Sequence, residues 1–388
     1  MIDRLVLGGV EKTAIEQVRA LREIGVDATL VVLKRDPSVP DAVREWLMDL
    51  PVEYLDDRLP RFLRTGWRIP GFYFFSLFHL LYAVVLPLRV RKGEWDVILS
   101  HNSYTTLTAL AIWKIRGIPY CMFVWDPIAS VLVRAYPTGL IRFLRPVLLP
   151  VGRWVDRSLV RGGRRVLVSS LSYVDYLRSS MRPEEELSMV PPGCRPAESA
   201  RQKPGEYLLA ATSWKAGKQL EVLLQALTLL PGPKLVVAGR WLHADYRSRI
   251  DELVSELGLT DRVSMTGEVS EKGMADLARN ALCSVTLNAE LGFGMPALEA
   301  AGQCCTFVCP RVAGVTAYFT DGIEAFYFDE GDSRGLASVL RPLVEQPDKA
   351  YRAGLAAWER ARASLTWQHH ARAIAAAIGA APSAQATR

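Results

Sequence analysis

The sequence predicts an α/β protein with two doubly wound domains in tandem. The chain of 388 residues exceeds the size of one ordinary hydrophobic core. Short apolar runs alternate with helical patterns in both halves, as in parallel sheets covered by helices. Residues 191–206 are rich in proline and glycine. We therefore place a linker there, between domains at 1–190 and 207–365.

The elements of the first domain begin with a helix at 11–24, which carries Ala14, Val18 and Leu21 on one face. Short apolar runs predict its strands at 28–33, 97–100, 121–124 and 166–169. The second domain has predicted strands at 207–211, 235–238, 263–265, 284–287 and 306–308. Doubly wound sheets bind ligands at the carboxyl ends of their strands. We therefore expect a site in a central cleft that both domains face.

The positive charge of the chain is concentrated in the first half. Residues 1–200 hold 27 basic and 21 acidic residues, and residues 58–178 alone hold 18 basic and 5 acidic ones. This pattern favours an acidic partner. Because no nucleic-acid-binding signature is present, we expect an anionic membrane surface or an anionic acceptor rather than nucleic acid. Residues 1–10 lack the pattern of a secretory signal, so we expect a cytoplasmic protein at the inner face of the plasma membrane.

An apolar run at 71–86, between Pro70 and Pro87, has three interpretations. As a helix it would cover about 24 Å, short of the roughly 30 Å of a hydrocarbon layer. An interfacial helix is favoured over a buried helix or a membrane span, because polar residues recur on one side. Basic residues that suit anionic headgroups follow at Arg89, Arg91 and Lys92.

The six cysteines do not predict a disulfide framework or a metal site. A cytosolic chain of this size seldom uses disulfides. Cys304, Cys305 and Cys309 lie on or beside an apolar strand, with no histidine near them in sequence, so we expect them in the core.

The most informative stretch reads Asn-Ala-Glu-Leu-Gly-Phe-Gly-Met-Pro-Ala-Leu-Glu-Ala at 288–300. It follows a predicted strand, and Pro296 suits the first turn of a helix. Gly292 and Gly294 allow the backbone to approach a ligand closely, and free amides at a helix start favour a diphosphate. Glu299, about one turn into the helix, can accept hydrogen bonds from ribose hydroxyls.

Together with other motifs, this stretch resembles the retaining glycosyltransferase family 4 of the GT-B fold. The family's corresponding segment reads Glu-Gly-Phe-Gly-Leu-Pro-x-Leu-Glu-Ala. Further matches are Gly-Gly-Val-Glu at 8–11, Trp-Lys-Ala-Gly-Lys at 214–218 and Leu-Val-Val-Ala-Gly at 235–239. Thr-Trp at 366–367 heads a last helix, 366–380, which in the family crosses back onto the first domain. The resemblance covers nearly the whole chain.

The resemblance implies roles for particular residues. Lys218, with Lys215 and Arg240, would neutralise the donor diphosphate, aided by the backbone of Gly292, Phe293 and Gly294. Glu299 would hold the ribose, and Gly8 and Gly9 would approach the donor phosphate and the acceptor. His101, Asp126 and Glu290 are the candidate catalytic residues.

Four features depart from the family pattern. The usual glutamate eight positions before Glu299 is Leu291, with Glu290 one residue earlier. The usual arginine five residues before the loop lysine is Ser213. Trp125 replaces a histidine after the fourth strand, which leaves His101 as the nearest candidate. Only seven residues precede Gly8, so either the first strand of the domain is missing or residues 5–7 are a remnant of it.

These observations predict a retaining glycosyltransferase that moves a hexose from a nucleotide-diphosphate sugar, such as GDP-mannose or a UDP-hexose. The acceptor would be a saccharide or a lipid-linked molecule of surface polysaccharide or glycolipid synthesis. No metal and no other cofactor is implied, because no Asp-x-Asp motif faces the expected cleft. The alternative is a non-catalytic nucleotide-sugar-binding or assembly protein of the same fold. A nicotinamide-dependent oxidoreductase is disfavoured because no strand is followed by Gly-x-Gly-x-x-Gly.

Overall fold

The computed structural model describes residues 1–6, 8–36, 39–60, 64, 77–125, 127–134, 139–171, 174, 177, 187–287 and 292–380. The chain divides into two compact units. Unit 1 comprises Met1–Val190 and His370–Arg388, and unit 2 comprises Pro191–His369. The expected linker at 191–206 thus belongs to unit 2, and the chain returns to unit 1 within its last helix, α15 (Trp367–Ile378).

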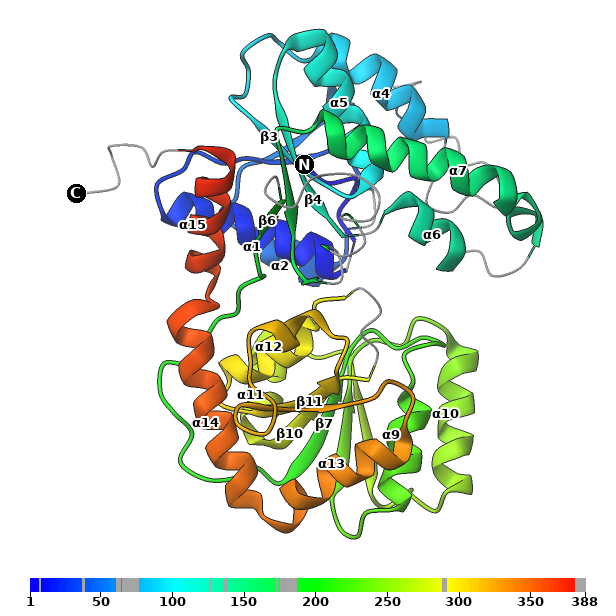
Figure 1. The fold of residues 1–388 in the computed structure, drawn as a ribbon, viewed down its shortest axis with the longest axis vertical. Coiled ribbons are helices and arrows are strands. Elements are labelled where there is room, and N and C mark those ends of the chain that lie inside the picture. The colour runs from blue at the N-terminus through cyan, green and yellow to red at the C-terminus, as the bar shows by residue number, and fades with distance from the viewer. Residues whose placement is uncertain are drawn as a thin grey trace. The chain divides into compact units, whose positions relative to one another are not determined.

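Unit 1 is built on two groups of parallel strands (Figure 1). One group, in the order β3-β4-β5-β6, contains β3 (Ile98–His101), β4 (Tyr120–Val124), β5 (Arg165–Val168) and β6 (Leu187–Met189). The other pairs β1 (Leu30–Val32) with β2 (Val52–Tyr54). The helices are α1 (Gly9–Glu23), α2 (Asp41–Trp46), η1 (Leu55–Arg58), α4 (Leu77–Arg89), α5 (Ser103–Arg116), α6 (Ile128–Arg134) and α7 (Gly139–Gly162).

The segment between β1 and β3 is residues 1–3. The amide of Ile2 donates to the carbonyl of Val31, and Ile2 bridges Val32 in parallel. On the other side, the Met1 amine donates to the Leu99 carbonyl over 2.6 Å. Leu5 is fully buried but forms no strand, and Leu7 lies outside the described residues. The segment that joins the two strand groups is therefore residues 1–3, and the described residues of the expected segment 5–7, Leu5 and Val6, form no strand.

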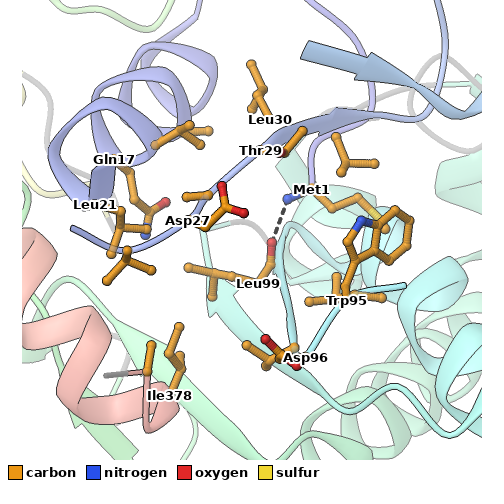
Figure 2. Close-up of a pocket in the computed structure, with 18 of the residues that line it drawn as sticks. Met1, Gln17, Leu21, Asp27, Thr29, Leu30, Trp95, Asp96, Leu99 and Ile378 are labelled. Carbon is orange, nitrogen blue, oxygen red and sulfur yellow. Dashed lines mark hydrogen bonds between the residues drawn. The ribbon is translucent and has the colours of Figure 1, made fainter. Parts of the chain in front are cut away.

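A cavity of about 750 Å³ extends from this short segment (Figure 2). Its lining includes residues 27–31 at the start of β1 and residues 93–99 at the start of β3. Gln17 and Leu21 of α1 and Ile378 of α15 also line it. The cavity thus lies toward the amino-terminal ends of the strands, opposite the edge where doubly wound sheets bind ligands. We interpret it as unfilled space between two strand edges.

Unit 2 has one six-stranded parallel sheet in the order β12-β11-β10-β7-β8-β9. Its strands are β7 (Tyr207–Ala211), β8 (Lys234–Ala238), β9 (Val263–Gly267), β10 (Ala281–Val285), β11 (Thr306–Pro310) and β12 (Ala325–Phe328). Its helices are α9 (Leu220–Thr228), α10 (Ala244–Glu256), α11 (Glu271–Asn280), α12 (Met295–Gly302), η3 (Gly314–Ala317), α13 (Ser333–Glu345) and α14 (Pro347–Ser364). The predicted strand at 284–287 begins earlier, because β10 starts directly after α11 ends at Asn280.

The apolar run predicted at 71–86 is described from Leu77 onward, as α4; residues 71–76 lie outside the described residues. Pro87 does not end this helix, which continues to Arg89. Tyr82 and Leu86 are fully buried and α4 packs on α5, whereas Val84 and Leu88 are exposed. Within the described residues, no helix has the length and apolar character to cross a bilayer.

Candidate functional site

The topology of unit 2 brings two predicted motifs to one edge of the sheet. β7 and β10 pair side by side in parallel although more than sixty residues separate them in sequence. From β7 the chain proceeds outward to β8 and β9, and from β10 it proceeds the other way to β11 and β12. The carboxyl ends of β7 and β10 therefore form the topological switch point, where open α/β sheets bind ligands. The loops after these two strands carry Lys218 and residues 292–294.

The loop after β7 is held by backbone hydrogen bonds and a left-handed turn. The Lys218 amide donates to the Lys215 carbonyl over 3.1 Å, with Gly217 at a φ of 88° inside the turn. Gln219 also has positive φ and caps α9, while its side-chain amide donates to Glu330. Lys215 is exposed and Lys218 half-buried, directly before the start of a helix.

The loop after β8 is tied to the loop after β7. The amide of Trp214 donates to the carbonyl of Arg240 over 2.7 Å, and the two loops form a parallel bridge at Trp214 and Trp241. Those two indoles stack with centroids 5.9 Å apart. Gly239 is required here, because a Cβ at that position would collide with the carbonyl of Thr212. These contacts place the backbone of Arg240 beside the loop that carries Lys215.

The loop after β10 leads into α12. The carbonyls of Gly292 and Phe293 accept hydrogen bonds from Gly314 and Val315 of η3. Phe293 is buried, and its ring packs near Tyr318. Gly294 caps α12 at a φ of 92°, a region that favours glycine. The first turn of a helix has amides without intrahelical partners, so this loop offers donors and the positive end of the dipole to an anion.

Glu299 lies in the second turn of α12 and is half-buried. It is close to Cys194, since its charge contributes to raising the pKa of that thiol to about 12, after the larger effect of burial. Pro296 occupies the first turn of the helix, as its fixed φ favours. Glu299 thus places a carboxylate on α12, the helix whose amino-terminal end lies at the switch point of the sheet.

Thr286 is a further candidate for the site that the sequence did not predict. It directly follows β10, and its hydroxyl oxygen is buried without a hydrogen-bond partner among the described residues. A buried hydroxyl without a partner costs free energy, which a ligand could recover. The only sequence signal was a polar residue at the end of an apolar strand, which is too common to single out.

In unit 1, Gly8 and Gly9 lie at the start of α1. Gly8 is the N-cap, and the Glu11 carboxylate lies over it, where a Cβ would collide. This arrangement corresponds to a capping-box glutamate in the third helical position. Gly9 opens the helix, and a Cβ there would meet nothing within 4 Å.

His101 lies at the end of β3 in an aromatic cluster of unit 1. Its side chain is buried, and its Nδ1 accepts a hydrogen bond from the indole N–H of Trp125 over 3.0 Å. The rings of Phe123 and Trp125 stack near it. Burial, followed by the positive charges of the Met1 amine and His370, lowers the pKa of His101 well below its usual value. The imidazole is therefore neutral, with its proton on Nε2.

Three residues of the prediction, Asp126, Glu290 and Leu291, lie outside the described residues. The described residues thus bring together Lys215, Lys218, Arg240, the loop at 292–294 and Glu299 on one edge of the unit 2 sheet. His101, Gly8 and Gly9 belong to unit 1 and are described there alone. The unit 2 set can stabilise a diphosphate through cations and amides, and it can hold hydroxyl groups through a carboxylate.

Both halves of the chain match known families. The Glycosyl transferase 4-like domain matches residues 8–193, and the Glycosyl transferases group 1 domain matches residues 196–360. The chain is 26% identical to the MMP alpha-(1->4)-mannosyltransferase of Mycolicibacterium hassiacum, over 72% of this chain and 69% of that one. It is 23% identical to the D-inositol 3-phosphate glycosyltransferase of Arthrobacter sp. strain FB24, over 76% of each chain.

The fold is similar to a solved structure of the same class. The crystal structure of Anabaena Alr3699/HepE in complex with UDP and glucose superposes with a TM-score of 0.72 and 16% identity. The superposition covers 98% of this chain and 99% of that one. Because the two domains match in this order along nearly the whole chain, and because its relatives transfer sugars, the chain belongs to glycosyltransferase family 4 and is an enzyme of the GT-B fold.

Proposed function

We propose that this glycosyltransferase moves a hexose from a nucleotide-diphosphate sugar to a saccharide or lipid-linked acceptor, with retention of anomeric configuration. One observation carries the donor assignment. Lys218 precedes α9, residues 292–294 precede α12, and both segments follow adjacent strands at the switch point of the sheet. Two helix starts and a lysine on one edge suit a diphosphate better than a neutral ligand.

The relatives suggest which donors to test first. One similar protein is a mannosyltransferase, and HepE was solved with UDP and glucose. GDP-mannose and UDP-hexoses are therefore the first donors to test, with mannose as the leading sugar. Glu299 would bind the ribose, and Lys215, Lys218 and Arg240 would neutralise the diphosphate as it leaves.

We also propose that transfer needs no metal ion. The leaving diphosphate gains negative charge as the glycosidic bond breaks, and fixed cations and amides can stabilise that charge. His101, Asp126 and Glu290 remain the candidates for catalytic roles. Since the imidazole of His101 is buried and neutral, its expected contribution is a hydrogen bond from Nε2 rather than a positive charge.

The proposed setting is surface polysaccharide or glycolipid synthesis at the inner face of the plasma membrane. Support comes from the 18 basic against 5 acidic residues at 58–178, within the unit proposed to bind the acceptor. A basic surface attracts anionic headgroups at about 1 kcal/mol per residue close to the surface.

The decisive experiment begins with thermal unfolding in the presence of a panel of nucleotide sugars, because a ligand of the folded state raises its apparent stability. The stabilising donor is then offered to a panel of saccharide and lipid-linked acceptors. The anomeric configuration of the product is read by NMR. Stabilisation by free NAD(P) but by no nucleotide sugar, or a product of inverted configuration, would refute the corresponding part of the proposal.

A further inference from the structure

Helix α7 of unit 1 has an apolar face that is exposed in the part of the chain that the structure describes. Phe143, Val147, Val151 and Trp154 are 82%, 66%, 53% and 67% exposed. Their spacing of four, four and three places them on one side of successive turns, and we call this set the α7 apolar face. Isolated exposed apolar residues are ordinary, but a continuous row with two aromatic rings marks an interaction surface.

The opposite side of α7 is firmly fixed to unit 1. Asp156 accepts hydrogen bonds from the amides of Ile128 and Ala129 at the start of α6, and from the Ser103 hydroxyl of α5. Gly152 lies against α6, where a Cβ would be 3.2 Å from Leu132. Arg145 donates to the Val133 carbonyl of α6. These contacts hold α7 against α5 and α6, as the ribbon shows (Figure 1). The α7 apolar face lies on the other side of the helix.

Positive charge borders the α7 apolar face. Four arginines of the helix are exposed: Arg142, Arg153, Arg157 and Arg161. The one acidic residue of α7 is Asp156, which is buried on the opposite side and occupied by three donors. Apolar residues with a tryptophan, flanked by arginines and without exposed acids, are the composition of helices that lie in a membrane interface. A surface that binds an ordinary protein partner usually carries charges of both signs. The exposed charges of α7 are all positive, which favours an anionic bilayer as the partner.

We propose that the α7 apolar face docks onto the surface of a bilayer containing anionic lipid, with Phe143 and Trp154 inserted at headgroup level and the arginines against lipid phosphates. The inference deepens the proposed membrane setting and rests on it. It differs from the sequence-based choice of the run at 71–86, because the described part of that run buries Tyr82 and Leu86 within the unit.

The test is cosedimentation with vesicles of phosphatidylcholine alone and of phosphatidylcholine mixed with phosphatidylglycerol. The wild type should bind the mixed vesicles and lose binding as salt rises. Phe143→Ser with Trp154→Ser should weaken partitioning roughly tenfold or more. Arg153→Gln with Arg157→Gln should weaken it by about fivefold per arginine on mixed vesicles.

Matched controls are exposed residues of unit 2. Val312→Ser with Ile323→Ser removes apolar side chains of similar exposure, and Arg334→Gln with Arg352→Gln removes two exposed arginines. Both pairs should bind vesicles as the wild type does. Circular dichroism and donor binding of every variant should be unchanged, which separates lost docking from lost folding.

The outcomes are separable. Vesicle binding by the wild type that survives all α7 substitutions overturns the docking assignment and leaves membrane attachment standing. Absence of binding by the wild type overturns membrane attachment as well. A dimer seen by light scattering that is lost in the Phe143→Ser, Trp154→Ser variant, without vesicle binding, would assign the face to a second copy instead.

Discussion

The indole N–H of Trp125 donates a hydrogen bond to Nδ1 of His101 over 3.0 Å, and both side chains are buried beside Phe123. Trp125 follows β4 and His101 ends β3, two neighbouring parallel strands. The tryptophan that departs from the family's histidine therefore acts directly on the histidine that remains. It fixes the tautomer of His101, with the proton on Nε2.

This pair predicts a pH dependence of stability. The pKa of His101 in the folded state lies below its usual value, so His101 binds a proton more readily in the unfolded chain than in the folded chain. The free energy of unfolding should therefore fall as pH drops below about 6.5. His101→Gln keeps an acceptor for the indole but cannot titrate, so its stability should depend less on pH. The buried Met1 amine and His370 both lie near His101. Burial lowers the pKa of the Met1 amine to about 5, so the free energy of unfolding should also fall through this group as the pH decreases.

Urea unfolding between about pH 8 and pH 5 measures this effect. His243→Gln is the matched control, because His243 is exposed at the start of α10. Parallel pH profiles for the wild type and His101→Gln would show that His101 does not titrate as its burial requires.

Donor binding should depend on Glu299 and Lys218. Glu299→Ala would remove the proposed hydrogen bonds to the ribose, and Lys218→Ala would remove a positive charge proposed to neutralise the diphosphate. Each change should weaken binding by about 1–3 kcal/mol in calorimetric titration with the stabilising donor. Glu252→Ala and Lys272→Ala change exposed residues of α10 and α11 and serve as controls. Unchanged donor affinity in a folded Glu299→Ala variant would refute its assignment.

Thr286→Val should separate binding from stability. The hydroxyl oxygen of Thr286 is buried without a partner among the described residues, so its removal should leave the free energy of unfolding unchanged or slightly higher. If the donor uses this hydroxyl, affinity should fall by about 1 kcal/mol. Chemical unfolding and calorimetric titration on the same preparation measure both quantities. Lower stability with unaltered affinity would show a purely structural role.

Sugar transfer should continue in the presence of EDTA. We expect the cations and amides after β7, β8 and β10 to stabilise the negative charge of the leaving diphosphate, which is what a divalent ion would otherwise do. The rate should be measured with a matched donor and acceptor, with and without chelator. Activity that disappears in EDTA and returns with magnesium or manganese would refute metal-free transfer.

A strand-forming extension ahead of Met1 should stabilise unit 1. Continued in register, it would place its next ladder hydrogen bonds at the carbonyls of Thr29 and Val97, beside the 750 Å³ cavity. It would also replace a buried amine by an ordinary peptide group. Val-Val-Ile-Val added before Met1 should raise the free energy of unfolding by about 1–3 kcal/mol. This figure is the gain from apolar burial less the conformational entropy lost when the four added residues become ordered.

The same extension gives a local readout. Hydrogen exchange at the amides of Val31 and Leu99 should slow, since both face the added segment. An extension of equal length, Gly-Ser-Gly-Ser, is the control. It should change neither the free energy of unfolding nor the exchange rates of the Val31 and Leu99 amides. Equal stability of the two extended chains would show that no strand enters the cavity.

Much of the fold was predictable because it depends on local pattern. Alternating apolar runs and helices predicted parallel sheets, and the strand at 207–211 is observed as β7. Among the residues that the structure describes, the strands β2, β6 and β12 were not predicted. The first two are short and half-buried, and a half-buried strand gives a weak apolar signal. The sequence placed the end of this helix at Pro87, but α4 continues to Arg89, although a proline at this position cannot donate a helical hydrogen bond.

The sequence by itself determined the α/β class, the glycine-rich loop before α12, and the lysines and glutamate that suit a nucleotide diphosphate. Each of these depends on residues close together in the chain, where backbone preference and side-chain chemistry act directly. Only the tertiary structure decided that β7 and β10 lie side by side, that Trp125 bonds His101, and that Asp156 turns the apolar face of α7 outward. These relationships join residues far apart in sequence, and their partners are selected by the packing of whole strands and helices, which no local pattern specifies.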